Sequence, residues 1–166
     1  MRKMIKTINA ILSTINITIL FVIVLCVTWQ VMARFIFKSP SIITDELSRL
    51  LFICLGLLGG AYTAGQNRHL AIDLLPMSLT GKPKQILFMV IQTIVIIFSL
   101  IIMVYGGGIL ALDTFESGQT SPALGWQMGY IYLCIPISGL LIIIYTISLV
   151  IEELKESVHA TDTINK

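Results

Sequence analysis

The fold is decided by INAILSTINITILFVIVLCVTWQVMA, residues 8–33, a stretch that is mostly apolar and carries no charge. A helix needs about 20 apolar residues to cross the hydrocarbon core of a bilayer, so this stretch is long enough to span it. Val31-Met32-Ala33 loosely fits a signal-peptide cleavage site. The apolar core of a signal peptide has only about 7–15 residues, however. We therefore expect an uncleaved first transmembrane helix.

Three further apolar runs, at about residues 47–64, 86–112 and 130–151, extend this pattern to four spans. Of the 166 residues, 56% are hydrophobic and 12% are charged, against roughly 25% charged in soluble domains. Strands are disfavoured, because transmembrane barrels show alternating patterns and not solid apolar blocks. We predict an all-α integral membrane protein that forms one domain, residues 1–166, with four transmembrane helices. Short interfacial segments are expected near residues 35–37 and 70–79.

The distribution of basic residues predicts the orientation of the four helices. If the helices alternate in direction, three basic residues fall on the side away from the amino terminus: Arg34, Lys38 and Arg49. The other eight fall on the side of the amino terminus: Arg2, Lys3, Lys6, Arg68, Lys82, Lys84, Lys155 and Lys166. Lysine and arginine are enriched in cytoplasmic loops. Both termini are therefore predicted to be cytoplasmic.

The cysteines do not form a recognisable reactive or metal-binding set. Cys26, Cys54 and Cys134 all fall inside apolar runs, and none belongs to a CxxC pair. Such residues usually act as small buried hydrophobes. No cysteine and histidine cluster has the spacing of a zinc site. We expect neither a metal site nor thiol chemistry.

Titratable groups are arranged for structure and not for catalysis. His69 and Asp73 are four residues apart and are expected to form a hydrogen-bonded pair that holds an interfacial turn. The other histidine, His159, lies in the carboxy-terminal tail, so haem ligation is not expected. No ionisable residue lies in the middle of a span, where ion-coupled carriers usually place one or break a helix. The chain is thus predicted to be no enzyme, to bind no cofactor and to carry no substrate by itself. A net charge of +2 does not indicate nucleic-acid binding.

Asp45, Glu46 and Arg49 form a charged cluster at the start of the second helix. The spacings i,i+4 and i,i+3 place both acids on the same helix face as Arg49, which favours a self-contained ion pair at the membrane interface. In the alternative reading, Arg34 at the end of the first helix pairs with Glu46 and fixes the hairpin. Either reading makes these residues structural polar anchors.

A ladder of small residues, Gly56, Gly60 and Ala64, follows one face of the second helix. Small residues at every fourth position allow helix backbones to approach closely in a membrane. The ladder is expected to pack against another helix. That helix could be internal, which we favour, or could belong to another protein.

The order of residues between 29 and 73 resembles the small permease subunit of tripartite ATP-independent periplasmic (TRAP) transporters, the DctQ/SiaQ type. The matching residues are Trp29-Gln30-Val31, Arg34, Pro40, Asp45-Glu46, Arg49, Gly56, Gly59, Gly60, His69 and Asp73. Chain length and the four-helix layout also fit the family. Thr44 departs from it, because an aromatic residue often precedes the acidic pair. Overall likeness leans towards the sialic acid subgroup.

The resemblance implies a scaffold subunit in a bacterial inner membrane. Its partners would be a large elevator-type subunit that holds the sodium and substrate sites, a periplasmic binding protein, and membrane lipids. The imported solute would be an organic acid, either sialic acid (N-acetylneuraminate) or a C4-dicarboxylate. Docking of the binding protein would fall to outward-facing residues: Arg34, Lys38, Asp113, Glu116 and Trp126. The alternative is a free-standing four-helix membrane regulator or assembly factor.

Overall fold

The computed structural model describes residues 2–66 and 82–164, with side chains for residues 5–66 and 86–151. These parts are helical, and their only β-type contact is an isolated bridge between Thr120 and Gln127. The elements are α1 (Arg2–Phe35), α2 (Ile42–Gly65), α4 (Lys82–Phe98), η2 (Ser99–Gly106), α5 (Gly107–Glu116), α6 (Gly129–Tyr132) and α7 (Cys134–Ile164). The prediction of an all-helical chain is confirmed for the described residues.

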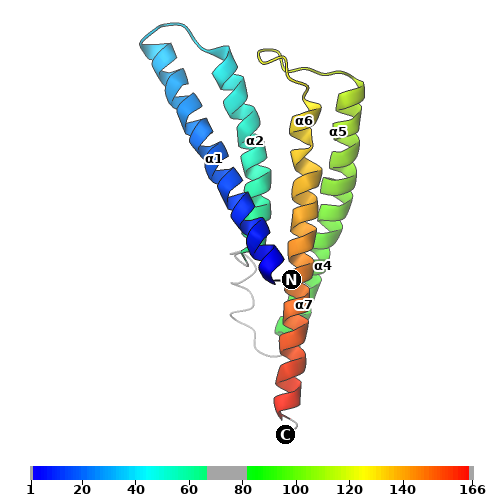
Figure 1. Cartoon of the computed structure of the whole chain (residues 1–166). Coiled ribbons are helices and arrows are strands. Elements are labelled where there is room, and N and C mark those ends of the chain that lie inside the picture. Colours follow the sequence, from blue (N-terminus) through cyan, green and yellow to red (C-terminus); the bar gives the residue numbers. More distant parts are fainter. Residues whose placement is uncertain (1, 67–81, 165–166) are drawn as a thin grey trace.

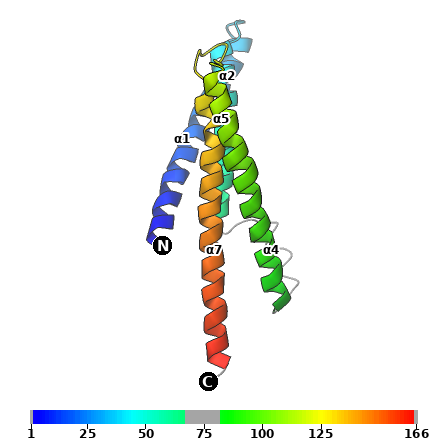
Figure 2. The ribbon, with the colours of Figure 1, turned by 90° about the vertical axis from the view of Figure 1, so that its right-hand side faces the viewer.

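The helices form two antiparallel hairpins that lie side by side (Figure 1). One hairpin is α1 with α2, and the other is α4, η2 and α5 with α6 and α7. The connections at residues 36–41 and 117–128 lie at the same end of the molecule, called here the loop end. The start of α1 and the end of α7 point to the opposite end (Figure 1). Seen from the side, α4 and the lower part of α7 diverge from each other (Figure 2).

Three helical stretches are long and apolar enough to cross a membrane: Ile5–Phe35, Ile86–Glu116 and Gly129–Ile151. They correspond to the first, third and fourth predicted spans, and they fit a multi-pass membrane protein. The second predicted span, residues 47–64, lies within α2, which is helical but is not among the three. Asp45, Glu46 and Arg49 occupy the first two turns of α2 and shorten its apolar part.

Between the two hairpins, α2 packs against α7. The side chains of Ala61 and Ala64 are fully or almost fully buried in α2, and Tyr145 is 2% exposed in α7. A Cβ atom added to Gly65 would lie 2.7 Å from the ring of Tyr145. The hairpins are thus held together by small residues of α2 that admit a large aromatic side chain from α7.

The predicted third span is one continuous helix with a π-helical middle. Residues Ser99–Gly106 form the π-helix η2, which joins α4 to α5 without a break and packs against α7. Ser99 is 1% exposed, and Gly139 of α7 lies directly against this widened turn. A Cβ atom on Gly139 would meet the Cβ atom of Met103 at 2.7 Å. The glycine therefore permits a close approach of α7 to η2.

Several threonine hydroxyl groups inside the apolar runs are satisfied by their own helices. Thr18 donates to the carbonyl oxygen of Thr14 at 2.8 Å, and Thr93 donates to that of Met89 at 2.8 Å. This i−4 bonding lets a hydroxyl enter lipid without an unpaired donor. Large apolar side chains point outward instead, including Phe21 (62% exposed). The outer surface therefore suits lipid or another apolar helix.

Candidate partner-docking site

The turn after α1 presents two cations at the loop end. Lys38 adopts a positive φ of 51°, and the amide of Ser39 donates to the carbonyl oxygen of Ala33 at 3.2 Å. Ser39 lies six positions after Ala33, so this bond closes a turn one residue wider than the 6→1 turn of a Schellman motif. A left-handed conformation costs a non-glycine residue about 1–2 kcal/mol. Arg34 and Lys38 are both exposed, and neither has a hydrogen-bond or ion-pair partner within the described residues.

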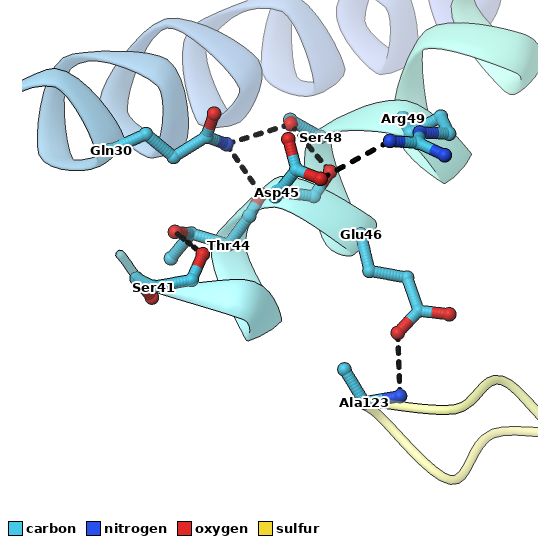
Figure 3. Close-up of polar contacts among 8 residues, drawn as sticks. All are labelled: Gln30, Ser41, Thr44, Asp45, Glu46, Ser48, Arg49 and Ala123. Carbon is cyan, nitrogen blue, oxygen red and sulfur yellow. Dashed lines mark hydrogen bonds and ion pairs between the residues drawn. The ribbon is translucent and has the colours of Figure 1, made fainter. Parts of the chain in front are cut away.

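Gln30 links α1 to α2 below this turn. Its Nε2 atom donates to the carbonyl oxygen of Thr44 at 2.7 Å and to the Oγ atom of Ser48 at 2.9 Å (Figure 3). The hydroxyl of Ser48 in turn donates to the carbonyl oxygen of Asp45. One amide side chain therefore fixes the relative position of the two helices at the loop end. The sequence contained Gln30 as part of the family pattern but gave no sign of this role.

The Asp45–Arg49 ion pair is present in α2. The Nη2 atom of Arg49 lies 3.2 Å from the Oδ2 atom of Asp45. The two side chains are 74% and 58% exposed, for Arg49 and Asp45 respectively, and an exposed pair of this kind contributes about 0–1 kcal/mol. The helix begins at Ile42 with Ser41 as its N-cap residue. Thr44 and Asp45 therefore lie inside the helix and do not cap it.

Glu46 connects the two hairpins. Its Oε2 atom accepts a hydrogen bond from the backbone amide of Ala123 at 2.6 Å (Figure 3). The expected alternative, an Arg34–Glu46 pair within the first hairpin, is wrong: the carboxylate turns towards the second hairpin instead. A backbone amide is a strong donor, and its bond to a carboxylate is charge-assisted. Because this donor belongs to the main chain, no side chain in the sequence signalled the contact.

The loop that Glu46 holds, residues 117–128, is an ordered turn. The amide of Ser121 donates to the carbonyl oxygen of Trp126 at 2.8 Å, and the amide of Gly125 donates to that of Ser121 at 2.9 Å. Ser121 is 1% exposed, whereas the indole of Trp126 is 58% exposed. Gly125 has a φ of +68°, which favours glycine. The loop therefore buries its centre and presents Trp126 outward.

The remaining predicted docking residues lie at the same end. Asp113 and Glu116 are exposed in the last turns of α5, and their side chains have no hydrogen-bond or ion-pair partner in the part of the chain that the structure describes. Together with Trp126 they belong to the second hairpin, whereas Arg34 and Lys38 belong to the first. The loop end therefore carries an acidic and aromatic part beside a basic part, joined by Glu46. The predicted pair of His69 and Asp73 lies outside the described residues.

The glycines of the predicted ladder do not pack inside the chain. A Cβ atom built on Gly56 or on Gly60 would have no atom within 4 Å, whereas Ala64 is buried. The expected packing of the ladder against another helix of this chain therefore holds for Ala64 and not for Gly56 or Gly60. Gly56 and Gly60 therefore leave free space along one face of α2, next to the exposed side chain of Phe52.

Comparison with known proteins identifies the family. The family model described as "Tripartite ATP-independent periplasmic transporters, DctQ component" matches residues 23–156. The chain belongs to this family. A TRAP transporter small permease protein of Haemophilus influenzae is 30% identical over 145 residues, covering 86% of each chain. The small permease protein SiaQ of a Vibrio cholerae sialic acid TRAP transporter is 25% identical over 138 residues, covering 83% of this chain and 78% of its own.

Two further similarities bear on partner and solute. A segment of the sialic acid TRAP transporter permease protein SiaT of Haemophilus influenzae is 29% identical over 77 residues, which is 46% of this chain and 12% of SiaT. The names of the relatives also differ in solute. The small permease protein TeaB of a Halomonas elongata ectoine TRAP transporter is 27% identical over 112 residues, which cover 68% of this chain and 58% of TeaB. Members of this DctQ family are transporter components and not enzymes.

Proposed function

We propose that this chain is the static scaffold subunit of a sodium-coupled TRAP transporter in a bacterial inner membrane. It supports a large transport subunit and helps to dock a periplasmic binding protein. The observation that carries the proposal is the division of the surface: apolar faces along the helices, and a polar loop end tied together by Gln30 and Glu46. In this arrangement α2 forms a fourth span and both termini are cytoplasmic.

The large subunit is the proposed partner of the apolar faces. Gly56 and Gly60 leave room for a close approach of a foreign helix to α2, and small residues are the usual contact points between membrane helices. The match to a segment of SiaT supports this partner, because there a similar sequence belongs to a permease that is several times longer. Lipids would fill the remaining space between the subunits.

The imported solute is proposed to be an organic acid, with sialic acid favoured over a C4-dicarboxylate. The similarity to the sialic acid proteins SiaQ and SiaT supports this choice. The test is uptake by proteoliposomes that contain the whole transporter and its own binding protein. Uptake of sialic acid but not of succinate is the expected result. Ectoine is tested as a third substrate, because the relative TeaB belongs to a transporter named for ectoine.

The proposal is tested by purifying the tagged chain from its native membranes in mild detergent and identifying its partners by mass spectrometry. We expect one large, multi-pass membrane protein in a constant ratio to the tagged chain. A monodisperse chain recovered alone, while other membrane complexes stay intact, would support the free-standing regulator instead. The Gly56→Leu and Gly60→Leu variants should lose the large protein and yet remain monodisperse.

The basic part of the loop end gives a prediction about binding-protein docking. The Lys38→Glu variant is expected to slow transport several-fold when the binding protein is limiting, and to recover when it is in excess. Charges at the edge of an interface act mainly on the association rate, which explains the recovery. The matched control is Lys6→Glu, the same change near the other end of α1. Equal transport by the Lys38→Glu variant and the wild-type protein at limiting binding protein would exclude Lys38 from the docking surface.

A further inference from the structure

Two cysteines meet at the contact between the hairpins. The Sγ atoms of Cys54 in α2 and Cys134 in α7 lie 2.9 Å apart, although 80 residues separate them in the sequence. Both residues are free thiols and are half-buried, whereas Cys26 in α1 is buried and belongs to no such pair. The expectation that each cysteine acts only as a small hydrophobe did not foresee this pair.

The location of the pair gives it a structural consequence. Cys54 lies midway along α2, and Cys134 is the first residue of α7. Apart from apolar packing, the hairpins are joined at the loop end by the bond from the Ala123 amide to Glu46. A covalent bond at the α2–α7 contact would make the relative position of the hairpins permanent. In a disulfide the sulfur atoms are about 2.05 Å apart, so the thiols need to approach by less than 1 Å.

We propose that Cys54 and Cys134 form a redox-sensitive modification site, at which a small, membrane-permeable disulfide oxidant produces an intramolecular disulfide between α2 and α7. One cysteine attacks the oxidant's S–S bond, becomes a mixed disulfide and releases half of the oxidant as a thiol. The other cysteine then attacks the protein sulfur of that mixed disulfide and releases the second half. The two cysteines are oxidised by two electrons, the oxidant is reduced to two thiols, and the two thiol protons of the protein end on them.

The geometry favours the second step over competing reactions. The attacking thiol is already in contact with the sulfur that it must reach, so the intramolecular step should outrun attack by a second oxidant molecule. The half-buried position limits access, which explains the requirement for an apolar and uncharged oxidant. Exposed apolar side chains beside the pair, such as Ile53 and Leu133, provide an entry route from lipid.

The test uses the full chain in mild detergent with Cys26 replaced by alanine and 4,4′-dithiodipyridine as the oxidant. Intact mass spectrometry distinguishes the products, because a disulfide removes two hydrogen atoms and a trapped mixed disulfide adds one thiopyridyl group per cysteine. We expect a monomeric product without adduct that dithiothreitol returns to the starting mass. The matched controls Cys54→Ser and Cys134→Ser, each in the Cys26→Ala background, should both keep one adduct and elute as monodisperse protein.

Three outcomes would overturn the proposal: adducts that persist on both cysteines, thiols that remain unreacted, or a disulfide between two chains. Only the transport measurement rests on the proposed function. If the subunit is a static scaffold, the reconstituted transporter should import its solute at the same rate before and after oxidation. A verified disulfide that stops transport would refute the static scaffold and leave the modification site intact, so the two failures are distinguishable.

Discussion

The Gly139→Ala variant is expected to unfold at a clearly lower temperature than the wild-type protein. The new Cβ atom would lie 2.7 Å from the Cβ atom of Met103, 3.1 Å from the Cγ2 atom of Val104 and 3.3 Å from the carbonyl oxygen of Ser99. A Cβ atom and a backbone oxygen cannot move aside as the end of a flexible side chain can. Overpacking of this kind costs about 1–3 kcal/mol. Thermal unfolding of the purified chain in detergent measures the effect.

Gly108→Ala is the matched control for this variant. Gly108 lies in α5, in the same hairpin, and a Cβ atom there would have no atom within 4 Å. In an open helical position, alanine is more favourable than glycine by up to about 1 kcal/mol. The same substitution should therefore raise the unfolding temperature at Gly108 and lower it at Gly139. A rise at both positions would show that α7 and η2 are not as closely packed as the structure describes.

The difference between these glycines shows where sequence reasoning stops. The apolar run at residues 8–33 predicted a helix, and α1 spans Arg2–Phe35, because in lipid a long uncharged segment has few alternatives to a helix. The pairing of helices is decided by contacts far apart in the chain. Nothing in the local sequence distinguishes Gly139, where an added Cβ atom would meet Met103, from Gly60, where it would meet no atom within 4 Å.

Some of the polar contacts could likewise be predicted from the sequence, and others could not. The Asp45–Arg49 pair follows from a spacing of four within one helix, and it was predictable for that reason. The partner of Glu46 was not predictable, because it is a main-chain amide 77 residues away. The Cys54–Cys134 contact likewise depends on the register of α2 against α7, which no local pattern encodes. Contacts within one helix could be inferred from the sequence, whereas the contacts between the hairpins could be found only in the structure.

That link gives the last prediction, which concerns Glu46. The Glu46→Ala variant removes the acceptor of the Ala123 amide, and with it the polar bond between the loop at residues 117–128 and α2. A hydrogen bond to a charged group contributes about 1.5–3 kcal/mol. Since each 1.4 kcal/mol corresponds to a factor of ten, the Ala123 amide should exchange with deuterium at least about ten-fold faster. Hydrogen-exchange mass spectrometry of peptides from this loop measures the change.

Asp45→Ala is the matched control, because it removes a neighbouring carboxylate whose only described partner is the exposed side chain of Arg49. This variant should leave the exchange of the loop unchanged.

If the loop also contributes to binding-protein docking through Trp126, Glu46→Ala should slow transport at limiting binding protein and Asp45→Ala should not. Fast exchange without a transport defect would separate the two roles: Glu46 would hold the loop, and the loop would lie outside the docking surface. Unchanged exchange in Glu46→Ala would remove Glu46 as the link between the hairpins, and the α2–α7 packing would then hold them together without it.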